Sequence, residues 1–220
     1  MKTVAAIHTA SPMVEPTKKL FAEHLPDVRL FNIADDSLIQ DVIRDGEVTT
    51  RTARRLLGYY FAAVDTGADL IFNTCSSVGE VVDAVQPVVA VPIMKIDEPM
   101  VTSAVQQATR IGVLATLPTT LGPTVRLVRK RAQALNKDVE VVEGLAEGAF
   151  AAVIAGDAAK HDSLILQTAQ KVAQQVDLIV LAQGSMARME DTLRQKTGKT
   201  VMSSPILGVL AVKEKLALME

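Results

Sequence analysis

Short runs of β-branched and aliphatic residues alternate with longer amphipathic segments along this chain. Eight such runs stand out: VAAIH, VRLFNI, DLIFN, VVAVPI, IGVLAT, VEVVEG, DLIVLA and TVMSS. Most are apolar throughout, which is typical of parallel strands covered by helices on both faces. The longest helices are expected at 49–66, 97–109, 118–136 and 157–175. The pattern predicts an α/β fold with parallel sheets.

The two halves of the chain resemble each other. GADLIFNTCSS resembles QVDLIVLAQGS, 108 residues later, and VAAIHT resembles IGVLAT at an offset of 107. VAVPI and MSSPI pair at an offset of 113. These pairings indicate two pseudo-symmetric lobes of about four strands each, not a solenoid of many repeats. We expect the first lobe at 1–95 and the second at 96–204, with a last helix at 205–220 that packs back on the first lobe.

The composition favours a small ligand over a macromolecular one. Hydrophobic residues make up 49% of the chain, the net charge is -2 and aromatic residues are 3%. Without a basic patch, stacking aromatics or a long apolar run, we expect neither nucleic acid nor a membrane as partner, and a cytoplasmic location. The single cysteine excludes an internal disulfide, and no motif for a metal is present. Abundant apolar helical surface suggests a homo-oligomer.

Polar residues gather in four loops that follow predicted strands. Parallel sheets bind ligands beyond the carboxyl ends of their strands, so two facing lobes are expected to enclose an active-site cleft lined by these loops. Neutral donors at helix N-termini suit a carboxylate, and we predict a small carboxylate as the ligand. The candidate substrate-binding residues are His8, Thr9, Ser11, Asn73, Thr74, Ser76, Ser77, Thr116, Thr119, Thr120, Gln183, Gly184 and Ser185.

Cys75 is the candidate catalytic residue. A lone cysteine is often just a small buried side chain. Here, however, it lies among hydroxyl residues, before the Val78-Gly79-Glu80 segment that looks like the start of a helix. Backbone N–H groups at such a turn are expected to lower the pKa of the thiol and favour the thiolate.

On the helix at 49–66, three arginines, Arg51, Arg54 and Arg55, are expected to form a solvated basic face.

These motifs resemble the aspartate/glutamate racemase superfamily, which includes hydantoin racemases, maleate isomerases and arylmalonate decarboxylases. The resemblance rests on N-T-C-S-S after DLIF, G-V-L-A-T-x-x-T in the middle of the chain, and the matching loop after DLIVLA. It implies an enzyme without a cofactor, in which two cysteines, one from each lobe, exchange a proton on opposite faces of a carbon next to a carboxylate. The first would be Cys75, and the second is expected where Gln183 stands.

Gln183 departs from that pattern. Its amide can form hydrogen bonds but has no proton that titrates in a useful pH range, so it cannot act as a general acid or base. This leaves a one-thiol racemase or isomerase, unless His8, Glu147 or Ser185 supplies a second base. The alternatives are a decarboxylase or lyase that acts on a substituted malonate, and a binding protein for small carboxylates that has no catalytic activity.

Overall fold

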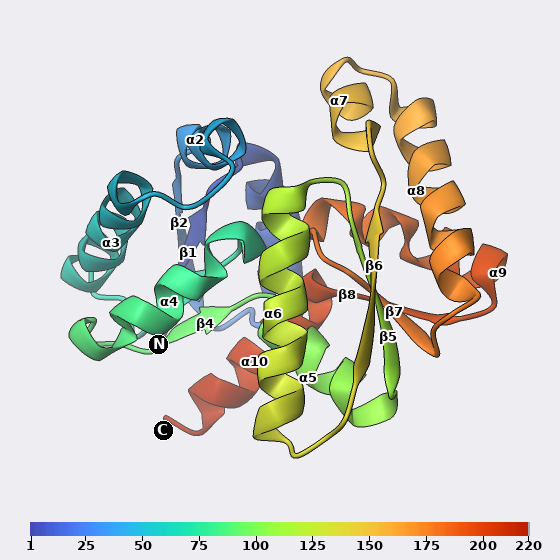
Figure 1. Cartoon of the computed structure of the whole chain (residues 1–220). Helices are drawn as coiled ribbons and strands as arrows, with labels where there is room; N and C mark the ends of the chain where they lie inside the picture. The colour runs from blue at the N-terminus through green and yellow to red at the C-terminus, as the bar shows by residue number, and fades with distance from the viewer. Residues whose placement is uncertain (220) are drawn as a thin grey trace. The chain divides into compact units, whose positions relative to one another are not determined.

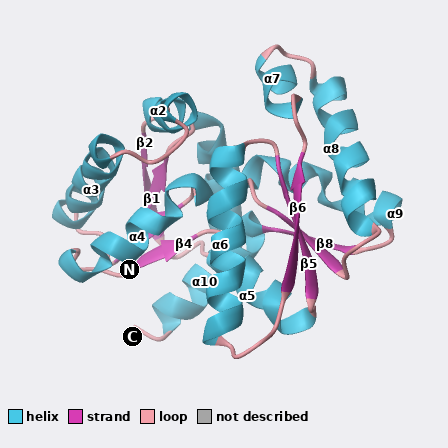
Figure 2. Cartoon of the chain, viewed as in Figure 1, coloured by secondary structure: helices cyan, strands magenta, loops and turns pink. Residues whose placement is uncertain are grey.

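The computed structural model describes residues 1–219 and divides into two compact units. The first unit contains Met1–Pro99 and the segment from Pro205 onward, and the second contains Met100–Ser204. Each unit has one four-stranded sheet in which all neighbouring strands are parallel, with helices around it (Figures 1 and 2). The predicted α/β fold with two parallel sheets is confirmed.

The first unit has the strand order β2-β1-β3-β4. Its strands are β1 (Thr3–His8), β2 (Arg29–Ala34), β3 (Leu70–Asn73) and β4 (Ile93–Lys95). Its helices are α1 (Val14–His24), α2 (Ser37–Asp45), α3 (Thr50–Asp65), α4 (Gly79–Val85) and α10 (Ser204–Ala217), with 3-10 turns η1 (Ser11–Met13), η2 (Ser76–Val78) and η3 (Gln86–Val88).

Successive residues of the central strands point to opposite faces of the first sheet, and each face has its own hydrophobic core. Ile7 and Ile71 pack with residues of α2, α3 and α4. Val4 and Phe72 pack on the other face with residues of α1 and α10. This double burial explains why the runs are apolar at nearly every position.

The second unit repeats this topology with the strand order β6-β5-β7-β8. Its strands are β5 (Arg110–Ala115), β6 (Glu140–Leu145), β7 (Leu178–Leu181) and β8 (Thr200–Ser203). Its helices are α6 (Pro118–Ala134), α7 (Ala149–Ile154), α8 (Ala158–Ala173) and α9 (Glu190–Thr197), with the 3-10 segment η4 (Gly184–Met189). Helix α5 (Glu98–Gln107) begins at the end of the first unit and continues into the second.

Two glycines let α8 approach the second sheet closely. A Cβ on Gly112 would lie 2.5 Å from Cγ1 of Val172, and one on Gly144 would lie 2.8 Å from Cγ2 of the same valine. Only glycine fits at such a close approach. Asp157 caps α8, since its carboxylate accepts a hydrogen bond from the N–H of Lys160 at 2.9 Å, as expected for a residue at the start of this helix.

One predicted strand lies elsewhere than expected. The run VVAVPI is not a strand along its length, because β4 begins only at Ile93. Pro87 and Pro92 lack N–H donors for a sheet, and the segment before β4 is held by Gln86. The side chain of Gln86 accepts from the N–H of Ile93 at 2.7 Å and donates to the carbonyl of Val91 at 3.1 Å.

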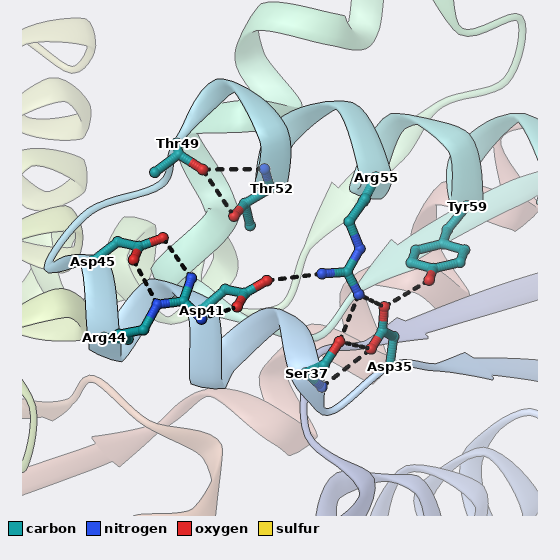
Figure 3. A network of polar contacts seen from close by, with 9 residues as sticks. All are labelled: Asp35, Ser37, Asp41, Arg44, Asp45, Thr49, Thr52, Arg55 and Tyr59. Atoms are coloured by element: carbon teal, nitrogen blue, oxygen red, sulfur yellow. Dashed lines mark hydrogen bonds and ion pairs between the residues drawn. The ribbon is translucent and has the colours of Figure 1, made fainter.

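The prediction of a solvated basic face on α3 is wrong for Arg55. Its guanidinium donates to Asp41 at 2.8 Å and also contacts Asp35 and Ser37 (Figure 3). The hydroxyl of Tyr59 donates to Asp35 at 2.6 Å. The network joins α2 and α3 at the carboxyl end of β2, so Arg55 is a structural residue of the first unit.

Candidate active site

Cys75, the candidate catalytic residue, lies at the carboxyl end of the first sheet, beside Thr9. In the parallel pairing of β1 with β3, Ile7 is opposite Asn73, so Thr9 and Cys75 stand two residues beyond the same pair. Cys75 itself has extended backbone angles (φ -125°, ψ 116°) and is the residue directly before η2. Strand pairing therefore places a hydroxyl and the thiol together.

The thiol of Cys75 is half-buried and its pKa is raised, not lowered as predicted. Burial is the main cause, because it disfavours the thiolate. Hydrogen bonds from the hydroxyl of Thr9, from the N–H groups of Ser77 and Val78, and from the hydroxyl of Ser77 act in the opposite direction without overcoming it. The predicted donors are thus present around the sulfur, but the resting form of Cys75 is the neutral thiol.

Asn73 fixes the turn that carries Cys75. It is fully buried; its amide donates to the carbonyl of Cys75 at 3.0 Å and its oxygen accepts from the hydroxyl of Tyr60 at 3.0 Å. Tyr60 of α3 is also fully buried, and its contact with Asn73 was not predicted from the sequence. Both polar ends of the Asn73 side chain have partners within the first unit.

His8 and Thr74 form a second buried pair behind this turn. The two ring nitrogens of His8 lie 2.8 Å from Oδ1 of Asn32 and 2.9 Å from Oγ1 of Thr74. Thr74 also donates to the carbonyl of Ile7 at 3.0 Å. Burial lowers the pKa of His8, and its hydrogen bond with Asn32 only partly offsets that effect. His8 is therefore a neutral, fully buried ring with both nitrogens engaged.

In the second unit, Thr116 and Gln183 occupy the positions that Thr9 and Cys75 have in the first. Leu114 pairs with Leu181, so Thr116 and Gln183 again stand two residues beyond a register pair. Gln183 lies directly before η4 with nearly the same backbone angles as Cys75, φ -120° and ψ 130°. Its side-chain oxygen accepts from the N–H of Thr116 at 2.7 Å, and Nε2 and Oγ1 of this pair are 2.9 Å apart.

The other predicted site residues differ in exposure. Ser11, Ser185 and Glu147 are exposed, while Gly184 is partly buried. Glu147 follows β6, an outer strand of its sheet. Thr119 and Thr120 lie in the first turn of α6, and Oγ1 of Thr119 is buried without a hydrogen-bond partner among residues 1–219.

Asp97 lies at the candidate site although it is not among the site residues predicted from the sequence. It lies two residues beyond β4, and Lys95 pairs with Asn73, so Asp97 stands at the same sheet level as Cys75. Its carboxyl group is 3% exposed and hydrogen-bonds with the hydroxyl of Ser76. Its partners come from a neighbouring strand end, which periodicity in the sequence does not reveal.

His161 does not pair with Asp157, although the two are one helical turn apart. Its Nδ1 lies 2.7 Å from Oδ1 of Asp162 and 3.2 Å from Nη2 of Arg188 in η4. Arg188 also donates to Oδ2 of Asp162 at 2.8 Å and lowers the pKa of that carboxyl group. This cluster ties α8 to η4, the segment that begins with Gly184.

Among residues 1–219, no three His, Cys, Asp or Glu side chains gather in a way that could hold a metal ion. No helix in the same range is both long and apolar enough to cross a bilayer.

Comparison with known proteins identifies similar sequences and folds. The family model Asp/Glu/Hydantoin racemase matches residues 6–212. A comparison with curated proteins gives no significant match. Among solved structures, a glutamate racemase from Bacillus anthracis is similar with a TM-score of 0.76 and 14% identity, over 99% of this chain and 82% of that one. The allantoin racemase from Klebsiella pneumoniae (0.70, 16%, 99% and 89%) and the aspartate racemase from Picrophilus torridus (0.70, 16%, 97% and 94%) have the same fold.

Proposed function

Because this chain belongs to the Asp/Glu/Hydantoin racemase family, we propose that it is a racemase or isomerase that needs no cofactor and uses Cys75 as its single thiol. Its substrate is a small acid, amino acid or derivative, and the reacting atom is the carbon next to the carboxylate. The solved racemases that share the fold act on glutamate, aspartate and allantoin according to their names, so these compounds and hydantoins are the first candidates.

The observation that carries this proposal is the matched geometry of Cys75 and Gln183. Both follow the third strand of a sheet by two residues, precede a 3-10 turn and contact the threonine that follows the first strand. The position is thus preserved in both units, but only the first holds an ionisable group. An amide can orient a carboxylate or an enediolate and cannot exchange a proton with carbon.

In the proposed reaction, Cys75 removes a proton from the α carbon and later returns one. Because the resting thiol is neutral, Cys75 first loses its proton to solvent. The thiolate then takes the proton from the α carbon, the electron pair of the C–H bond moves into the enediolate, and the resulting thiol returns a proton to carbon. The N–H groups of Ser77 and Val78 and the hydroxyl of Thr9 stabilise negative charge on the sulfur. Inversion requires a proton on the opposite face. Both ring nitrogens of His8 already have hydrogen-bond partners, so we propose Ser185, Glu147 or water as the source of this second proton.

A second candidate function is decarboxylation of a substituted malonate, and the raised pKa of Cys75 favours it. In that reaction the bond between the α carbon and one carboxylate breaks, carbon dioxide leaves, and the electron pair remains on the enediolate. The neutral thiol then donates its proton to carbon on one face. No second acid or base is required, which agrees with glutamine at position 183.

The test is isotope exchange in heavy water with wild type, Cys75→Ser and Cys75→Ala. Aspartate, glutamate, allantoin, hydantoins and substituted malonates are incubated separately, and deuterium at the α carbon is measured by mass spectrometry. Chiral chromatography separates racemisation from exchange with retention, and release of carbon dioxide identifies decarboxylation. We expect label with at least one substrate and its loss in both variants.

Two outcomes would contradict the proposal. Exchange that is undiminished in Cys75→Ala would exclude the thiol as the acid–base group. Absence of exchange with every compound, combined with protection of Cys75 from alkylation by one of them, would identify a binding protein instead.

A further inference from the structure

We propose that Asp97 sets the direction of the Ser76 hydroxyl and thereby decides whether the turn beside Cys75 accepts a carboxylate. This inference deepens the proposed function and rests on it for the place of the substrate carboxylate, next to Cys75. In this role Asp97 is a positioning residue, because it acts through Ser76.

Strand pairing puts Asp97 and Ser76 together. In the β3–β4 pair, Asn73 is opposite Lys95, and the N–H of Ile96 donates to the carbonyl of Asn73 at 3.0 Å. The chain then delivers Asp97 beside the turn that starts with Cys75 and Ser76. Asp97 and Ser76 are 3% and 7% exposed, and their side chains are hydrogen-bonded to each other.

One oxygen of this buried carboxyl group has no partner. Oδ1 of Asp97 is buried and makes no hydrogen bond with any part of residues 1–219. A buried, ionised carboxylate normally has all its acceptor sites satisfied, so an orphan oxygen is expensive for the charged form and less so for the acid. The geometry thus favours a carboxyl group that can carry a proton.

The charges around Asp97 do not offset its burial. Burial raises the pKa of Asp97, while Ser76, the charge of Lys95 and the N–H of Asp97 itself oppose the rise and the charge of Glu98 adds to it. The ammonium of Lys95 is 2.9 Å from Oδ1 of Asp83 and 3.8 Å from Oε2 of Glu98. Lys95 is therefore engaged by two other carboxylates.

Two states of Ser76 follow from the protonation of Asp97. When Asp97 is ionised, the O–H of Ser76 donates to it. A carboxylate near Cys75 then faces only the lone pairs of Oγ of Ser76 and the negative charge of Asp97, and both repel it. When Asp97 is protonated, it donates to Oγ of Ser76, and the O–H of Ser76 is free to donate to the ligand. Carboxylate binding then favours the protonated form, and affinity falls as pH rises through the pKa of Asp97.

The single cysteine allows a test that needs no substrate. Iodoacetate and iodoacetamide both alkylate the thiolate of Cys75, but only iodoacetate carries a carboxylate. Both rates depend in the same way on the fraction of Cys75 that is thiolate, so this dependence cancels in the ratio of the two rates. The ratio therefore reports how well the turn accepts an anion. Mass spectrometry counts one modified residue per chain, because Cys75 is the only cysteine.

We expect the iodoacetate to iodoacetamide ratio of wild type to fall about five- to tenfold between pH 5 and pH 9, as the charge on Asp97 appears. Asp97→Asn should hold a high ratio throughout, because its amide N–H donates to Ser76 at every pH. Ser76→Ala should have a low ratio already at pH 5. The control Glu98→Gln removes a neighbouring carboxylate and should keep the fall of wild type, which separates Asp97 from general charge effects. A high ratio of Asp97→Asn at every pH separates Asp97 from titration of His8, because His8 is still present in that variant.

A ratio that does not change with pH in wild type would overturn this inference, as would an Asp97→Asn profile identical to that of wild type. The wild-type profile and Ser76→Ala decide the matter even if Asp97→Asn does not fold. A clear profile without any isotope exchange would keep the anion site and reject the racemase proposal. Exchange with a flat profile would reject only the role of Asp97.

Discussion

Replacement of Tyr60 by phenylalanine removes one hydroxyl from the contacts that hold the Cys75 turn. Tyr60 and Asn73 are both fully buried, and their hydrogen bond is 3.0 Å long. The loss of a typical net hydrogen bond costs about 0.5–1.5 kcal/mol, and an acceptor left unpaired in the interior costs about 1–3 kcal/mol. Because the ring remains, no cavity forms, and we expect the free energy of unfolding to fall by about 1–3 kcal/mol.

Tyr60→Phe should also make the thiol of Cys75 more accessible. The amide of Asn73 donates to the carbonyl of Cys75, so a less firmly held Asn73 loosens the turn around the sulfur. Urea denaturation measures the stability, and the rate of alkylation by iodoacetamide at fixed pH measures access to Cys75. We expect lower stability together with faster alkylation.

The neighbouring Tyr59 provides a matched control, because the chain has only these two tyrosines. Its hydroxyl donates to Asp35, which keeps Ser37 and Arg55 as partners when that hydroxyl is lost (Figure 3). Tyr59→Phe should therefore cost less than Tyr60→Phe and leave the alkylation of Cys75 unchanged. Equal costs for the two variants, or unchanged alkylation in Tyr60→Phe, would refute the reasoning.

Four further variants test the site and the fold. Gln183→Cys should restore a second thiol at the position equivalent to Cys75 and increase the racemisation of aspartate or glutamate relative to exchange with retention, as measured by chiral chromatography; no gain would argue against the equivalence. Gly208→Ala places a Cβ 3.0 Å from Cζ of Phe72 and should cost about 1–3 kcal/mol in urea denaturation. Gly58→Ala, with nothing within 4 Å, should instead stabilise α3 by about 0.5–1 kcal/mol, and a reversed order would contradict the packing of α10. Burial acts to raise the pKa of Asp35, but its hydrogen bonds prevail and lower it, so its stabilising effect is complete above the unfolded value of 3.8 and lost as pH falls through the lower folded value. The difference in urea stability between wild type and Asp35→Asn should accordingly vanish in acid, and a difference that persists there would show that charge is not its cause.

The fold could be predicted from the sequence because buried parallel strands and the internal repeat both leave visible patterns in it. Apolar runs mark buried parallel strands, and the repeat at offsets of 107 and 108 reflects two sheets of the same order. The strand predicted from VVAVPI was too early, since hydropathy does not register the missing donors of Pro87 and Pro92.

The candidate site was less accessible from the sequence, because its properties depend on contacts between distant residues. The loop containing Cys75 was identified by its hydroxyl neighbours, but the direction of the pKa shift was wrong since burial outweighs the nearby donors. Tyr60 and Asp97 meet the site only after β1, β3 and β4 are paired. Arg55 looked like a surface charge because its partner Asp35 lies 20 residues away.

The return of α10 to the first sheet has a consequence for synthesis of the chain on the ribosome. Val209 and Val212 of α10 cover the face formed by Val4 and Phe72, although more than a hundred residues separate them. The second unit is continuous from Met100 to Ser204 and is translated completely before α10 emerges. The sheet that carries Cys75 is translated first and acquires its full hydrophobic cover last, so a fragment that stops at residue 204 would expose this apolar face and be prone to aggregation.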